Sequence, residues 1–158
     1  SAGTDAKVQW LRDVIGVDHA FNYRSTDIGQ SLRAACPAGI HVLLENASPE
    51  HLSAALPLMN ELRQVLIAGL VGTYSTDGKV CVSHFEFVLD RFLTVQSYRF
   101  MDSLDRYDEF VADMLRWRRE GRMHLEAFVY DGLEQAPAAL CALLGGRHIG
   151  KPLVRLAH

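Results

Sequence analysis

A lysine and a tyrosine near the start of the chain are the first side chains whose type and spacing suggest a ligand. Lys7 stands in the first turn of a helix expected over residues 4–16, and Tyr23 ends a short strand expected over residues 19–23. In a doubly wound sheet both places border the adenosine ribose of a dinucleotide, at the carboxyl ends of the strands. The alternative is a surface lysine and a half-buried tyrosine.

The residues just before Lys7 favour a phosphorylated ribose. A site for NAD normally has an acidic residue directly after the second strand, where it binds the ribose 2′-hydroxyl. Here that place holds Ser1-Ala2-Gly3-Thr4, and Lys7 follows one turn later. A cation together with hydroxyl groups suits a 2′-phosphate, so these residues predict NADP(H) as the cofactor.

Three later places could also face a cofactor. Asn46 follows an expected buried strand, and Tyr74 lies in the loop after the next one, so both would border the crevice of such a sheet. The alternatives are that Asn46 caps the following helix and that Tyr74 is a packed loop aromatic. Residues 145–151 are Gly-rich and basic, which suits either a phosphate or a plain turn between a helix and a strand.

Several catalytic motifs are missing from the sequence. It contains no G-x-G-x-x-G, no phosphate-binding P-loop and no G-x-S-x-G nucleophile elbow. No tyrosine is followed four residues later by lysine, which excludes the pair used by short-chain reductases. No cysteine or histidine spacing fits a zinc site, so we expect no metal.

The elements that must position these residues alternate along the chain. Capping signals open helices at Thr4, at Asp27 with Gln30, and at Ser48 before Pro49. The expected helices cover residues 4–16, 27–35, 48–59, 84–90, 104–120 and 134–144, and the expected strands cover residues 19–23, 40–45, 64–70, 93–98, 127–130 and 152–156. This alternation predicts an α/β protein with a largely parallel sheet, whose strand over residues 40–45 is buried on both faces.

Composition excludes several classes of function. The chain has 158 residues, 49% of them hydrophobic and 22% charged, and a net charge of −3. That charge gives no reason to expect nucleic acid or an anionic membrane as a partner. No apolar run approaches the roughly 20 residues of a membrane span, and no signal peptide is visible. Three scattered cysteines suggest free thiols in a reducing cytoplasm.

Six stretches, in order, resemble the zinc-independent medium-chain dehydrogenase/reductases, and among them the NADPH-dependent prostaglandin and alkenal double-bond reductases. They are residues 2–7, 20–24, 45–46, 68–74, 120–123 and 150–154, and they are spread over nearly the whole length of the chain. The resemblance implies an incomplete Rossmann-type, doubly wound, mainly parallel sheet that lacks its first two strands and its Gly-rich loop. Residues 1–123 would be a partial dinucleotide-binding domain, and residues 124–158 the segment that returns to the substrate domain.

The resemblance also implies roles for individual residues. Lys7 and Tyr23 would hold the 2′-phosphate of NADPH, with Gly3 and Thr4 lining that pocket. Asn46 would face the cofactor, as would His148, which stands where the family usually has a cofactor-binding asparagine. Tyr74 would lie beside the nicotinamide ribose and the substrate, and it is our candidate catalytic residue. The implied reaction is hydride transfer to the β-carbon of an α,β-unsaturated ketone or aldehyde, followed by protonation of the enolate.

Three departures from the family pattern fall on the nicotinamide side of the site. The usual Asp-Asn-Val-Gly-Gly is replaced by residues 45–49, Glu-Asn-Ala-Ser-Pro. Gly72 stands where a serine is usual, and His148 replaces the asparagine of the C-terminal Gly-Lys turn. These changes put contacts to the nicotinamide in doubt and favour, as an alternative, a non-catalytic α/β nucleotide-binding or assembly module.

The resemblance further implies that much of the family's protein lies outside this sequence. The substrate domain, the first two strands and the Gly-rich loop would precede Ser1, so we expect the parent protein to be an enzyme and this chain alone to be inactive. Without the first strand, residues 40–44 would form an unpaired edge that invites self-association. We therefore expect a homodimer, and family dimers join through the strand over residues 93–98.

Overall fold

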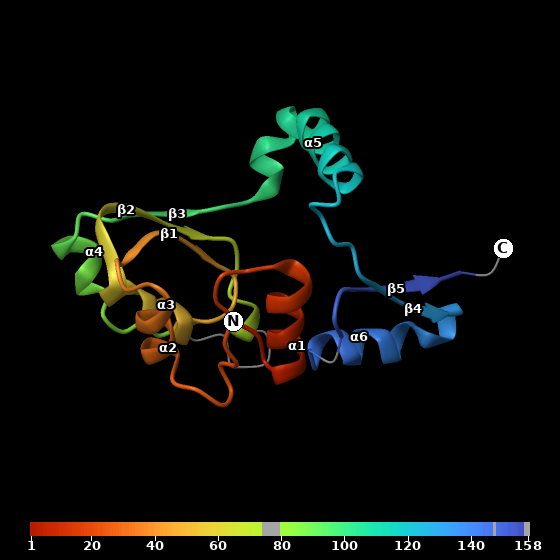
Figure 1. Ribbon diagram of the computed structural model, residues 1–158, viewed down its shortest axis with the longest axis horizontal. Helices are drawn as coiled ribbons and strands as arrows, with labels where there is room; N and C mark the ends of the chain where they lie inside the picture. The colour runs from red at the N-terminus through yellow and green to blue at the C-terminus, as the bar shows by residue number, and fades with distance from the viewer. Residues whose placement is uncertain (74–79, 147, 157–158) are drawn as a thin grey trace. The chain divides into compact units, whose positions relative to one another are not determined.

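A computed structural model describes residues 1–73, 80–146 and 148–156, which form two compact units. Unit 1 comprises Ser1–Arg24 and Asp108–His158, and unit 2 comprises Ser25–Tyr107. Helices alternate with strands, and the strands within each unit pair in parallel (Figure 1). The predicted α/β class is therefore confirmed. In the described ranges no helix has the length and apolar character needed to cross a membrane.

Unit 2 is built on a sheet of three parallel strands. Their order is β1-β2-β3, with β1 at Ile40–Glu45, β2 at Met59–Ile67 and β3 at Thr94–Ser97. Helices α2 (Ile28–Ala35), α3 (Pro49–Ala55) and α4 (Glu86–Asp90) contribute side chains to one cluster against this sheet. The helix expected from residue 84 begins two residues later, since Phe85 is its N-cap.

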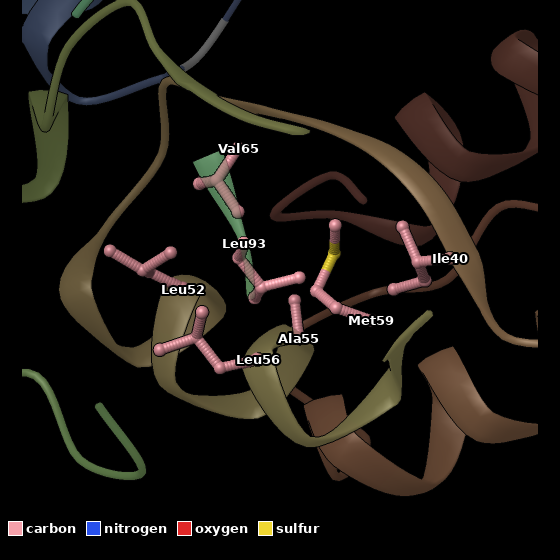
Figure 2. Packing of buried hydrophobic residues seen from close by; sticks show 7 residues of the cluster. All are labelled: Ile40, Leu52, Ala55, Leu56, Met59, Val65 and Leu93. Atoms are coloured by element: carbon pink, nitrogen blue, oxygen red, sulfur yellow. The ribbon is translucent and has the colours of Figure 1, made fainter. Parts of the chain in front are cut away.

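The core of unit 2 forms between α3 and the sheet (Figure 2). Leu52, Ala55 and Leu56 recur at helical spacing, so one face of α3 is apolar and packs inward. Leu56, Met59 and Val65 are the largest side chains that are fully buried. Close packing of these three groups holds β2 against α3, which fixes the loops at the carboxyl end of the sheet.

The predicted caps of α2 and α3 are confirmed. The Asp27 carboxylate accepts a hydrogen bond from the Gln30 amide at 2.7 Å, and the Ser48 hydroxyl accepts one from the His51 amide at 3.4 Å. The α-helical part of α3 ends at Ala55 and continues as a 3₁₀ turn over Leu56–Leu58. Pro57 lies in that turn and cannot continue an α-helix, so the predicted shortening is also confirmed.

Two expectations about the strands of unit 2 were wrong. β2 begins at Met59, not at residue 64, because Ile40 pairs with Met59 before the register shifts and Val42 pairs with Gln64. It ends at Ile67, which pairs with Glu45. β1 is not buried on both faces, since Val42 and Leu44 are 58% and 62% exposed. Leu43, on the opposite face, packs against the core cluster, and β1 is one of the two edge strands of the described sheet.

Unit 1 begins with the predicted turn and helix. α1 spans Asp5–Trp10, continues as a π-helical turn over Leu11–Ile15, and ends at Gly16, whose φ of +76° suits glycine. The strand expected over residues 19–23 is reduced to one parallel bridge between Ala2 and Asn22. It is short because only Ala2 pairs with it in the part of the chain that is described.

The rest of unit 1 contains two helices and a two-stranded parallel sheet. α5 spans Tyr107–Arg119, and α6 spans Ala136–Leu144. β4 (Ala127–Asp131) pairs with β5 (Lys151–Arg155). The predicted range of each strand agrees with the observed one to within one residue. The helix expected over residues 104–120 is confirmed as α5, but it begins at Tyr107, because the residues before it form a 3₁₀ helix over Phe100–Arg106. The predicted boundary after residue 123 remains a prediction.

Candidate functional site

The opening turn holds Gly3 against Tyr23. Parallel hydrogen bonds join the Ala2 amide to the Phe21 carbonyl at 3.0 Å and the Tyr23 amide to the Ala2 carbonyl at 3.1 Å. A Cβ atom built on Gly3 would stand 3.0 Å from the Tyr23 hydroxyl oxygen and 3.2 Å from Arg24 Nε. A side chain at position 3 would therefore push Tyr23 or Arg24 away, which explains the glycine.

Thr4 and Asp5 have their side chains engaged within this turn. The Thr4 hydroxyl accepts a hydrogen bond from the Lys7 amide at 3.3 Å and so caps α1. Asp5 Oδ1 accepts a hydrogen bond from Asn22 Nδ2 at 2.7 Å. The Asp5 carboxylate is thus held toward residue 22, and the first turn of α1 offers Lys7 as its cationic group.

Lys7 reaches the C-terminal end of α6. Its Nζ donates a hydrogen bond to the Gly146 carbonyl oxygen at 2.6 Å. An open pocket of about 140 Å³ lies beside this contact, and its lining includes Ala2, Lys7, Trp10, Leu11, His148 and Gly150. Two predicted cofactor-binding residues from opposite ends of the chain, Lys7 and His148, are therefore brought to one pocket within unit 1.

His148 is supported by two aromatic residues of β4. Its Nε2 lies 3.0 Å from the Tyr130 hydroxyl oxygen, within hydrogen-bond distance, and its ring stacks on Phe128 with centroids 4.8 Å apart. Phe128 and Tyr130 are two residues apart on one strand, so their rings extend from the same face of β4. These contacts fix the orientation of a half-buried imidazole at the edge of the pocket.

Asn46 lies in unit 2, directly after β1, and its side chain is exposed. A Cβ atom built on Gly69 would stand 2.6 Å from Asn46 Oδ1, so the glycine leaves the space that this amide occupies. The alternative role as a helix cap does not apply, because Ser48 caps α3. The buried Glu45 carboxylate accepts hydrogen bonds from the Ala47 and Ser48 amides, which holds the turn after Asn46.

Two departures from the family pattern meet in this turn. A Cβ atom built on Gly72 would stand 3.0 Å from both the Ala47 carbonyl oxygen and Ser48 Cβ. The family pattern has glycine at position 48 and serine at position 72, whereas this chain has the reverse. Each small residue makes room for the larger one opposite, so the two changes form a matched pair.

His51 continues the same turn. Its Nδ1 lies 3.0 Å from the Ser48 hydroxyl oxygen. Burial lowers the pKa of His51, and the nearby Glu45 carboxylate only partly offsets that effect. The neutral imidazole is thus the favoured form.

The predicted site residues fall into separate groups. Gly3, Thr4, Lys7, Tyr23 and His148 belong to unit 1, and Asn46 belongs to unit 2, while Tyr74 lies outside the described residues. Sequence reasoning missed Trp10, the Gly146 carbonyl and the aromatic pair that supports His148. The sequence did contain a signal for that pair, because Phe128 and Tyr130 are two residues apart on one expected strand and so share a face. Over the described ranges, no group of three histidine, cysteine or acidic side chains could hold a metal ion.

The parallel strands and their connecting helices define an α/β protein of the Rossmann type. The chain belongs to the zinc-binding dehydrogenase family, whose profile matches residues 15–154, and the predicted membership of the medium-chain dehydrogenase/reductases is confirmed. The predicted absence of zinc remains a prediction.

Individual relatives match over almost the whole chain. A zinc-type alcohol dehydrogenase-like protein of Schizosaccharomyces pombe is 32% identical over 99% of the chain and 45% of its own length. The NADPH-dependent curcumin reductase of Escherichia coli is 29% identical over 99% of the chain and 47% of its length. The crystal structure of CurA from Vibrio vulnificus in complex with NADPH superposes with a TM-score of 0.89 at 29% identity, covering 99% of this chain and 48% of that one. The chain thus spans about half the length of these relatives.

Proposed function

We propose that this chain is the C-terminal, NADP-binding part of an oxidoreductase that reduces the C=C bond of α,β-unsaturated ketones or aldehydes. One observation carries the proposal: Lys7 lines a pocket beside the turn in which Gly3 and Tyr23 are packed together. A relative named as an NADPH-dependent curcumin reductase and a solved structure of CurA with NADPH support the same cofactor and substrate class.

The side chains present suit a 2′-phosphate better than a free ribose hydroxyl. The described lining of the pocket includes no aspartate or glutamate, and it includes the Lys7 ammonium group. The nearest acid in the turn, Asp5, is bound by Asn22 at 2.7 Å. A lysine ammonium attracts a phosphate dianion strongly, whereas an NAD site would need a free carboxylate for the 2′-hydroxyl.

We assign the remaining roles on the same basis. Bound NADPH would supply a hydride to the β-carbon of the conjugated substrate. Tyr74 is the proposed catalytic residue, which would donate a hydrogen bond to the developing enolate oxygen. Asn46 would orient the cofactor from the turn after β1, while Thr4 shapes the 2′-phosphate pocket by capping α1. We further propose a cytoplasmic homodimer.

Lys7 provides the sharpest test, in the full-length protein that carries this chain. Lys7→Ala should raise the KM for NADPH by roughly tenfold or more, because a charge-assisted contact contributes about 1.5–3 kcal/mol. The KM for NADH should change little, as NADH has no phosphate at that position. Arg118→Ala removes an exposed cation from α5 and serves as the control. Equal losses with both cofactors would contradict the proposed pocket.

A non-catalytic nucleotide-binding or assembly module remains the second candidate. It is favoured by Pro49, Gly72 and His148, which depart from the family pattern. The matched fit of Ser48 and Gly72 argues against simple decay of the site. NADPH binding by the full-length protein without reduction of any enone or enal would favour the module.

A further inference from the structure

The helix α5 carries an apolar stripe along one side. At 3.6 residues per turn, five of its side chains fall within about 160° of the helix circumference, namely Phe110, Val111, Met114, Leu115 and Trp117. None of them is buried, and Phe110 and Leu115 are 55% and 46% exposed. A stripe of this width normally packs against another element, so this side of α5 is suited to contact with a partner.

The apolar side chains are arranged symmetrically about the middle of α5. Phe110 and Trp117 lie on one margin of the stripe, at equal distances from the point between residues 113 and 114. Val111 and Leu115 lie on the other margin, at equal distances from residue 113, and Met114 lies in the centre of the stripe. Each margin therefore reads alike from either end of the helix, with two aromatic residues on one and two aliphatic residues on the other.

A two-fold axis between two such helices would match these margins. In an antiparallel pair related by that axis, each margin faces the same margin of the second helix in reverse order. Phe110 then meets Trp117 of the second copy, which suits the packing of two aromatic rings. Val111 meets Leu115 of the second copy, and the two Met114 side chains meet near the axis. Every residue of the stripe thus faces an apolar counterpart.

The charges of α5 follow the same symmetry. Asp108 and Arg119 lie beside the Leu115 margin at opposite ends of the helix, and their midpoint is again between residues 113 and 114. Both side chains are exposed, and neither forms an ion pair within the described part of the chain. On the opposite side of the helix, by contrast, Arg116 lies 2.7 Å from Asp113 and 4.0 Å from a Glu120 oxygen.

These two charges distinguish the possible orientations of a helix pair. An antiparallel pair would place Asp108 opposite Arg119 of the second copy, and the two-fold axis would produce this ion pair twice. A parallel pair would instead place each residue opposite its own like charge, which is repulsive. The charge pattern therefore favours a second copy of this helix, in antiparallel orientation, as the occupant of the stripe.

We propose that α5 binds the α5 helix of a second copy of this chain in antiparallel orientation, around a two-fold axis beside Met114. The inference goes beyond the proposed function and does not depend on it. It assigns a surface separate from the edge strands β1 and β3, because all of its residues lie in α5. A helix of 13 residues is about 20 Å long, so the interface is small and the expected Kd is on the order of 10–100 μM.

Reversal of the two charges tests the orientation and the register together. Sedimentation equilibrium measures the Kd of the 158-residue chain carrying Leu44→Lys, a substitution that opposes pairing through β1. Asp108→Arg and Arg119→Asp should each raise the Kd about tenfold, since either one replaces two attractive pairs by two repulsive ones. The double variant should recover the original Kd to within about threefold, because it restores both pairs with their signs exchanged.

Two simpler explanations predict different results. The single reversals change the net charge in opposite directions, so general repulsion between chains cannot weaken binding in both. Each reversal also opposes the helix dipole, so a loss of helix stability would make the double variant worse than either single variant. Arg33→Asp, at an exposed position of α2, is the matched control for Arg119→Asp and should leave the Kd unchanged.

Met114→Lys provides a second test, because it places two like charges beside the axis and should abolish the dimer. Far-ultraviolet circular dichroism confirms that each variant keeps its helices. A Leu44→Lys chain that stays monomeric at all concentrations, or a double variant that does not recover, would overturn the inference. So would a full-length protein that Met114→Lys destabilises without any change in association, since the stripe would then pack within one molecule.

Discussion

At the scale of single residues, the exchange between positions 48 and 72 shows how a departure from a family pattern can preserve packing. Ser48 provides a hydroxyl that caps α3, which glycine cannot do with a side chain. Gly72 then leaves the space that Ser48 Cβ and the Ala47 carbonyl need. The two residues are 24 positions apart in the sequence, so their packing against each other is visible only in the folded chain.

Restoring the family residue at one position alone should therefore be unfavourable. Gly72→Ser is expected to lower the free energy of unfolding by about 1 kcal/mol, because the added atoms crowd a backbone carbonyl. Gly72→Ser combined with Ser48→Gly should recover most of that loss, since glycine costs only a few tenths of a kcal/mol as a cap. Urea unfolding of both single variants and the double variant measures the coupling energy. Additive effects would contradict a matched pair.

At the scale of elements, the first turn of α3 combines a cap with a titratable group. Burial lowers the pKa of His51, so the unfolded chain binds a proton more readily than the folded chain does. Stability is then fully present above the unfolded value of about 6.5 and falls as the pH drops through it. The pKa of Glu50 is lowered by its hydrogen bond with Ser48, so that carboxylate stays ionised down to pH 5.5 and contributes nothing there.

Stability should thus decline between pH 7.5 and pH 5.5, and His51 should account for part of the decline. His51→Gln is expected to reduce the loss by somewhat less than about 1 kcal/mol, because the side chain is only partly buried. Free energies of unfolding from urea titrations at the two pH values measure the difference. His124→Gln, at an exposed position, should leave the decline unchanged, and an equal effect of both substitutions would refute the role of His51.

The helices were predictable from local chemistry, whereas the strands depended on distant partners. Thr4, Asp27 and Ser48 each accept a backbone hydrogen bond within their own helix, so short-range sequence patterns contain that information. The early start of β2 depends on its register with β1, and the exposure of Val42 depends on which face the helices cover. Likewise, the resemblance indicated His148, but nothing local placed Tyr130 beside it.

At the scale of the whole molecule, the exposed edge strand β1 is the feature most suited to association. Val42 and Leu44 lie on its uncovered face, and among the described strands only β2 pairs with it. Unpaired strand edges with apolar side chains recruit further strands. This arrangement fits the expected self-association of the 158-residue chain, although the homodimer itself remains a proposal.

Substitution of an edge residue tests this expectation. Leu44→Lys should shift the chain toward the monomer, because a charged side chain on an edge strand opposes pairing with a second strand. Sedimentation velocity across a concentration series measures the distribution. Leu89→Lys is the control, since Leu89 is 76% exposed but lies on α4. A monomer at all concentrations, or an equal shift by both substitutions, would count against association through β1.

The contact between Lys7 and Gly146 joins residues 139 positions apart, which has a consequence for folding during synthesis. The residues of unit 2 form one continuous stretch, so they can fold as soon as residue 107 has left the ribosome. Unit 1 combines Ser1–Arg24 with Asp108–His158, so the turn that contains Lys7 gains its contact with Gly146 only after residue 146 has emerged. The pocket beside Lys7 is therefore completed late, and a ribosome that stops before residue 146 would release a chain in which unit 2 can fold but this pocket lacks part of its lining.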